Sequence, residues 1–243
     1  MTYCVGMRID KGLVFMSDTR TNAGIDNVST FKKMFAWSTP GERVIVIQTA
    51  GNLATTQAVI SLLEERMKAP ADRNPGILEV PTMFQVAKLV GDTLKEVVAA
   101  QSGQGPVADS AFSATIIVGG QIAGSEPRLF LVYPEGNFIE ASDETPYFQI
   151  GETKYGRPIL LRGYEPQMDF TDTVKLLMLS FESTLRANLS VGMPLDLLTY
   201  EADSLTLGQE RRITSDDTYF QAIAEAWSDS IKASIKALPD YKF

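Results

Sequence analysis

The chain has 243 residues, a hydrophobic fraction of 44% and a formal net charge of −8 at pH 7. It is long enough to bury a substantial core, and its acidic balance argues against a nucleic-acid partner, since neutralising phosphates needs a basic surface. No apolar run approaches the roughly 20 residues that span a bilayer, and no signal-peptide pattern opens the sequence, so we expect a cytoplasmic protein without a membrane partner.

The first fifty residues predict strands, and the next fifty predict helices. Apolar and β-branched runs separated by turn-forming residues predict strands over residues 2–8, 12–18, 33–37 and 43–50. The continuity of these runs indicates strands that are buried on both faces. Apolar residues then recur at helical spacing from Leu53 to Met67 and from Met83 to Val97.

The second half repeats this block order. Strands are predicted over residues 112–118, 128–133, 137–140 and 147–150, with a hairpin turn at 134–137. A long helix follows, with one apolar face from Phe170 to Leu189, and a last helix runs from about 217 to 237.

The order is therefore strands, two helices, strands, two helices. It predicts two sheets, each covered by helices on one face, in a single α+β domain over residues 1–243. This is a four-layer αββα sandwich. A doubly wound parallel sheet fits less well, because strands and helices do not alternate and no strand is followed by a Gly-rich phosphate loop.

The side-chain inventory restricts the chemistry. Histidine is absent, which excludes Ser-His and Cys-His catalysis and His-ligated zinc. Cys4 is the single cysteine, so the chain has no internal disulfide, and its apolar surroundings predict a buried side chain. Hydrolytic chemistry would have to use hydroxyls, amines and carboxylates, and we expect no metal or cofactor.

Four short motifs follow one another from the first residues: Thr2 directly after Met1, then residues 17–20 (SDTR), 31–34 (FKKM) and 49–51 (TAG). Their order and spacing resemble those of proteasome β subunits and the bacterial peptidase HslV. The run over residues 14–24 is most similar to the bacterial Anbu (ancestral beta subunit) group. The resemblance implies the proteasome-type fold of N-terminal nucleophile (Ntn) hydrolases, with activity as a threonine peptidase.

By this resemblance, removal of Met1 makes Thr2 the nucleophile and, through its α-amine, the base. Asp18 matches the family aspartate, Lys33 the catalytic lysine and Gly51 the glycine whose N–H lines the oxyanion hole. Lys33 is preferred to Lys32 because the family lysine immediately precedes an apolar strand. Adjacent strand residues point to opposite faces, so only one of the two lysines can face Thr2.

These residue types suit the chemistry. A threonine hydroxyl needs a base within hydrogen-bond reach, and an α-amine with a reference pKa of about 7.7–8.0 is partly neutral at pH 7. A nearby ammonium lowers that pKa further, and an aspartate can hold the ammonium in place. A backbone N–H at a strand end can stabilise an oxyanion.

The later motifs follow the family less closely. Where the family has Gly-Ser-Gly, this chain has Gly151, Glu152 and Thr153, and Glu152 is equally compatible with a surface and a site position. Ser190 fits the family serine, and Asn188 is the nearest candidate for its aspartate. The resemblance also implies a largely apolar substrate pocket lined by Thr21, Phe31, Thr49 and Leu53.

Other interpretations stay open at this point. Taken singly, Asp18 is typical of a solvated turn, and Gly51 of a helix entry with Asn52 as N-cap. The chain could be a non-catalytic shell subunit of a proteasome-like assembly, or an Ntn amidase that acts on a small molecule. The resemblance implies a homo-oligomeric ring or spiral, with a peptide or amide substrate; it does not define an ATPase partner.

Overall fold

Two antiparallel sheets form the centre of the protein. The computed structural model describes residues 2–22, 28–68, 75–101 and 112–243. The first sheet contains, in order, β10 (Tyr147–Gly151), β1 (Tyr3–Ile9), β2 (Gly12–Asp18), β11 (Leu195–Glu201) and β12 (Glu210–Ile213). The second contains β5 (Met34–Thr39), β6 (Arg43–Gly51), β7 (Ala114–Ile122), β8 (Arg128–Val132) and β9 (Phe138–Glu140). A short ribbon pairs β3 (Arg20–Asn22) with β4 (Val28–Thr30).

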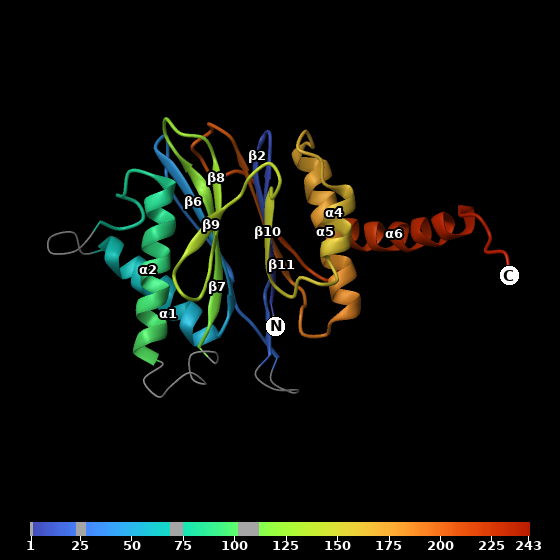
Figure 1. Cartoon of the computed structure of the whole chain (residues 1–243), viewed down its shortest axis with the longest axis horizontal. Coiled ribbons are helices and arrows are strands. Elements are labelled where there is room, and N and C mark those ends of the chain that lie inside the picture. The colour runs from blue at the N-terminus through green and yellow to red at the C-terminus, as the bar shows by residue number, and fades with distance from the viewer. Residues whose placement is uncertain (1, 23–27, 69–74, 102–111) are drawn as a thin grey trace.

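Helices cover the outer face of each sheet (Figure 1). The second sheet is covered by α1 (Leu53–Lys68) and α2 (Met83–Gln101), and the first by α4 (Arg157–Gly163) and α5 (Phe170–Ala187). The last helix, α6 (Thr218–Ala237), extends away from the sandwich and carries the C-terminus at its far end (Figure 1). The predicted αββα sandwich is thus the observed architecture.

The buried apolar residues fall into three clusters, as three interfaces between four layers require. One cluster packs α1 and α2 on the second sheet around Ile47 and Leu94. Another packs α5 on the first sheet around Met16 and Phe181. The third lies between the sheets around Phe15 and Ile117. Because β1 and β2 face two of these interfaces, they are buried on both faces, as their apolar runs predicted.

Local sequence sets where the helices begin. Asn52 Oδ1 accepts a hydrogen bond from the Thr55 N–H at 3.1 Å, so the predicted N-cap of α1 is present. Asp169 caps α5 in the same way by accepting from the Asp172 N–H at 2.8 Å. Side-chain caps of this kind satisfy N–H groups that have no partner within the helix.

The structure corrects the predicted order in the last third of the chain. Two strands, β11 and β12, separate α5 from α6, so the two last helices are not consecutive. β11 is a central strand, paired with β2 on one side and β12 on the other. Its leucines are also strong helix formers, so the strand preference is weak in isolation and the pairing with β2 decides it. The helix α4 and the ribbon of β3 and β4 were also not predicted.

None of the helices within the described ranges combines the length and apolar character needed to cross a membrane.

Candidate active site

The site lies where β2 and β6 end, beside the residue that precedes β1. Pairing of β1 with β2 brings the Tyr3 N–H to Asp18 Oδ1 at 3.0 Å. In the opposite sheet, the Thr49 N–H donates to the Lys33 carbonyl at 2.9 Å, so Lys33 lies next to the end of β6. Residues from the ends of several strands thus converge at one edge of the sandwich.

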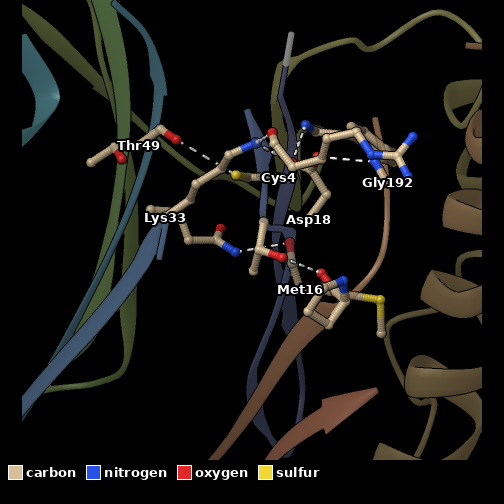
Figure 2. Close-up of polar contacts among 11 residues, drawn as sticks. Cys4, Met16, Asp18, Lys33, Thr49 and Gly192 are labelled. Carbon is tan, nitrogen blue, oxygen red and sulfur yellow. Dashed lines mark hydrogen bonds and ion pairs between the residues drawn. The ribbon is translucent and has the colours of Figure 1, made fainter. Parts of the chain in front are cut away.

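Asp18 and Lys33 form a buried ion pair that joins the two sheets (Figure 2). Lys33 Nζ lies 2.7 Å from Asp18 Oδ1 and donates a second hydrogen bond to the Arg20 carbonyl at 2.5 Å. The second carboxylate oxygen, Asp18 Oδ2, accepts from the Gly192 N–H at 3.3 Å. Asp18 is 0% exposed and Lys33 is 4% exposed. Both charged groups are therefore fixed in position by several partners.

Burial and hydrogen bonding have opposite effects on the pKa of Asp18. Burial raises the pKa of the Asp18 carboxyl above its ordinary value, while the Lys33 ammonium and the N–H groups of Tyr3 and Gly192 lower that pKa in part. Removing the ammonium would leave a fully buried carboxyl whose remaining partners are two backbone N–H groups. The charge of Asp18 therefore depends on Lys33.

A cavity of about 500 Å³ brings Thr2 together with these groups. Thr2 lines it with the two lysines, and the far wall is the end of β6 and the start of α1. The lining residues are Thr2, Thr21, Lys32, Lys33, Thr49, Ala50, Gly51, Asn52, Leu53, Thr56 and Gly151. Thr2, Lys33 and Gly51, three residues chosen from the sequence, therefore face one space.

Two glycines at this cavity have backbones that other residues rarely adopt. Gly51 has φ +120°, and an added Cβ would lie 2.5 Å from the Ser113 carbonyl oxygen. Gly151 has φ +83°, and an added Cβ would lie 1.9 Å from the Thr2 carbonyl oxygen. Both positions need glycine for its conformation and for the close approach of backbone.

The two neighbouring lysines have different environments, although both precede β5, neither lies in a strand and both line the cavity. Lys33 is buried on Asp18, whereas Lys32 is exposed and its ammonium lies 5.6 Å from the centre of the Phe35 ring. Lys32 still reaches the rim of the cavity. The lysine that contacts Asp18 is thus the one preferred from the sequence.

The residues expected to form a substrate pocket are mostly together. Thr21, Thr49 and Leu53 line the cavity, but Phe31 is not among its lining residues. The Phe31 side chain is 36% exposed, and its N–H donates to the Thr19 carbonyl at 2.8 Å.

Hydrogen bonds connect Thr2 to Glu152, and Glu152 through Asn188 to Ser190. The Glu152 N–H donates to the Thr2 carbonyl at 2.6 Å. Glu152 Oε2 accepts from Asn188 Nδ2 at 2.9 Å, and Asn188 Oδ1 accepts from the Ser190 N–H at 2.9 Å. Glu152 is 8% exposed, so it occupies a buried position rather than a surface one.

Several functional contacts use backbone groups that the sequence did not reveal. The Arg20 carbonyl and the Gly192 N–H hold the ion pair, and Ala50 and Thr56 line the cavity. No sequence motif identifies such groups, because any residue supplies an N–H and a carbonyl and only the fold aims them. Cys4 is fully buried, as predicted, and donates its Sγ–H to the Thr49 carbonyl.

Within the described part of the chain, no cluster of three or more Cys, Asp or Glu side chains could hold a metal ion.

An αββα sandwich that places a threonine, a lysine and an aspartate at one edge has the architecture of the proteasome-type Ntn fold. The sequence matches the family model described as Proteasome subunit over residues 2–197. The chain therefore belongs to the proteasome subunit family.

Solved structures narrow the likeness to Anbu. The chain is 47% identical to the Anbu (Gly-1) mutant from Hyphomicrobium sp. strain MC1 and 45% identical to Anbu (ancestral beta-subunit) from Yersinia bercovieri, with 100% of each chain covered and TM-scores of 0.94 and 0.93. It is 46% identical to the chain in the helical assembly of the Anbu complex from Pseudomonas aeruginosa, with a TM-score of 0.90 over 99% of this chain and 98% of that chain. The resemblance inferred from the motifs is thereby confirmed. A comparison with curated proteins found no match.

Proposed function

We propose that this protein is a threonine-type peptidase or amide hydrolase whose nucleophile is Thr2, exposed by removal of Met1. The observation that carries the proposal is the buried Asp18–Lys33 pair beside the cavity that Thr2 and Gly51 line. Burying two charges costs several kcal/mol per ion unless the geometry repays it. Because Thr2 and Lys33 line the same cavity, the buried Lys33 charge can influence a reaction at Thr2.

The proposed reaction forms an ester at Thr2. The hydroxyl oxygen attacks the substrate carbonyl carbon, and the α-amine of the same residue takes the hydroxyl proton. The Gly51 N–H stabilises the resulting oxyanion. The carbon–nitrogen bond then breaks, the leaving amine takes the proton, and a water molecule hydrolyses the ester with the α-amine again as base.

Lys33 and Asp18 would assist this reaction through electrostatics. The Lys33 ammonium disfavours a second positive charge nearby, so it lowers the pKa of the Thr2 α-amine and keeps more of it neutral. Asp18 holds the ammonium at the cavity through the 2.7 Å ion pair. While Met1 is attached, the Thr2 nitrogen is part of a peptide bond and cannot act as a base. The chain that retains Met1 should therefore be inactive.

The substrate is expected to be a peptide or another amide. The cavity presents hydroxyl and apolar groups from Thr21, Thr49, Ala50 and Leu53. Such a lining suits a small or medium apolar side chain next to the scissile bond. Its volume of about 500 Å³ can hold such a side chain with the adjoining backbone.

Self-assembly and a cytoplasmic location belong to the same proposal. A similar chain, from Pseudomonas aeruginosa, is described in a helical assembly. We expect this protein to form a ring or spiral of many copies in the cytoplasm, where the single Cys4 stays reduced. Light scattering that shows a stable monomer at micromolar concentration would contradict the assembly.

A peptide α′,β′-epoxyketone tests the chemistry directly, because its ring closure needs a hydroxyl and an amine on one residue. We expect a stoichiometric adduct at Thr2 in Met1-free protein, verified by intact mass, and no adduct in Thr2→Ala or when Met1 is retained. A panel with varied apolar side chains guards against a poor fit to the cavity. An adduct that survives Thr2→Ala would show that Thr2 is not the nucleophile, and no adduct across the panel would favour a non-catalytic structural subunit.

A further inference from the structure

Glu152 is a buried acid whose two side-chain hydrogen-bond partners are both uncharged groups. Its oxygens accept from the Asn188 side-chain amide at 2.9 Å and from the Lys154 backbone N–H at 3.1 Å. No lysine or arginine of the described residues forms an ion pair with it. A buried carboxylate is costly unless a positive charge lies near it. The hydrogen bonds from Asn188 and Lys154 thus leave this buried acid without a cationic partner among the described side chains.

The same residue is fixed against Thr2. The pairing of Tyr3 with Gly151 continues to Thr2 and Glu152, and the Glu152 N–H donates to the Thr2 carbonyl at 2.6 Å. This contact sets the Glu152 backbone against Thr2, the residue whose nitrogen becomes an ammonium when Met1 is removed. Asn188 holds the carboxylate there, since its own oxygen is fixed by the Ser190 N–H.

Three of the other charged groups near the site already have partners, and the fourth is a cation. Asp18 and Lys33 neutralise each other, and the Arg20 guanidinium donates to the Leu189 carbonyl. Lys32 reaches the cavity rim from the opposite sheet. Glu152 is thus the buried acid on the Thr2 side of the site that a new α-ammonium could pair with.

We propose that Glu152 is a positioning residue that pairs with the α-ammonium of Thr2 and sets the pH range in which Thr2 can act as its own base. The inference rests on the proposed function, because it requires a free amine at Thr2. Lys33 and Glu152 then act in opposite directions: the lysine favours the neutral amine, and the glutamate favours the charged one. The side chain holds the amine in place at the cost of making it a base only at higher pH.

The test is a titration of the α-amine itself in Met1-free protein, through the pH dependence of its acetylation by acetic anhydride, measured by mass spectrometry of the N-terminal peptide. Glu152→Gln keeps the shape and the acceptor for Asn188 but removes the charge. We expect it to lower the pKa of the α-amine by about one unit or more. The low-pH limb of epoxyketone labelling should move to lower pH by the same amount.

Two variants complete the experiment. Glu201→Gln removes an exposed carboxylate opposite Gly12, at the far end of the sheet from Asp18, and should leave the titration unchanged. Glu152→Asp retains the charge and should keep the pKa above that of Glu152→Gln. If Glu152→Gln fails to fold, the comparison of wild type with Glu152→Asp decides: a longer reach of the carboxylate should give the higher pKa.

The outcomes separate the two proposals. Equal α-amine pKa values in wild type and Glu152→Gln, or a higher one in the variant, would overturn the role of Glu152. Absence of epoxyketone labelling at every pH would overturn the proposed hydrolase. The acetylation titration would still decide the role of Glu152, because it needs no catalysis.

Discussion

Two parts of the layer between the sheets have opposite chemistry. In its middle the sheets touch through apolar groups, and a Cβ added to Gly119 would lie 2.6 Å from the Phe15 ring. At the end where β2 and β6 stop, the same layer buries Cys4, Ser17, Asp18, Lys33 and Gln48. The close apolar contact fixes the distance between the sheets, and the polar end uses that distance to bring a lysine of one sheet to an aspartate of the other.

The largest effect is expected from breaking the polar end. Lys33→Ala should slow epoxyketone labelling by on the order of 100- to 10,000-fold, since under the proposed function the Lys33 charge keeps the α-amine neutral. It should also cost about 3–5 kcal/mol of unfolding free energy, because the buried Asp18 carboxyl loses its cationic partner. Labelling rates and denaturant unfolding measure the two effects.

Two controls separate function from stability in that experiment. Lys32→Ala, at the exposed neighbour, should largely preserve labelling. The double variant Asp18→Asn with Lys33→Met should recover much of the stability, because no charge is left buried, yet remain unlabelled. Equal labelling of the Lys32 and Lys33 variants would show that the assignment is wrong.

The next effect concerns Cys4, which shares the polar end but has no role in the proposed reaction. Burial raises the pKa of its thiol, and the nearby Asp18 charge raises it further. Because the thiolate is the reactive form, it should be scarce at pH 8 in the folded protein. We expect alkylation by iodoacetamide to be on the order of 100-fold slower than in denaturant, as followed by mass spectrometry. Rapid alkylation of the native protein would show that this end opens to solvent.

A smaller effect is expected from crowding the apolar middle. Gly119→Ala should cost about 1–3 kcal/mol of unfolding free energy through overpacking against Phe15. Combining it with Phe15→Leu, which frees space, should cost less than the sum of the single changes. Labelling at temperatures well below unfolding should change little, because the site lies at the other end of the layer. A double variant with strictly additive losses would indicate that the two residues do not compete for space.

The smallest effect is expected at Ser17. Its Oγ has no hydrogen-bond partner among the described protein groups, although the residue is 0% exposed. Ser17→Ala should therefore change the unfolding free energy by less than about 0.5 kcal/mol, or raise it slightly. Thr19→Val is the matched control, because Thr19 Oγ1 donates a hydrogen bond to the Pro194 carbonyl at 2.7 Å. This substitution should lower the unfolding free energy by about 1 kcal/mol. A larger loss at Ser17 would mean that its hydroxyl is satisfied by an internal water.

Most of the helices and strands could be predicted from the sequence, because local apolar patterns determine them. Apolar runs marked β1, β2 and β6, and the helical spacing of apolar residues marked α1, α2 and α5. The sequence did not predict β11, because the strand conformation of β11 comes from its pairing with β2. Leu195 of β11 lies opposite Asp18 of β2, and the two residues are 177 positions apart in the chain. Pairing over such a distance is a property of the fold rather than of a segment.

The candidate site divides in the same way. Side chains with a motif, such as Asp18 and Lys33, could be predicted, and they form the expected contact. Glu152 was ambiguous, because nothing in its own segment shows that β10 would set it beside Thr2. Backbone partners such as the Gly192 N–H could not be predicted, since their usefulness depends only on where the chain passes.

The partners of Asp18 determine when the site is completed during folding. Its carboxylate is held by Tyr3 from the same sheet, by Lys33 from the other sheet and by Gly192 from the segment before β11. These three partners come together only after the sheets have closed on each other and the last third of the chain has been added. A partly folded or still growing chain lacks the complete set. If Thr2 acts as proposed, the charge arrangement that its reaction needs is therefore complete only in the fully folded chain.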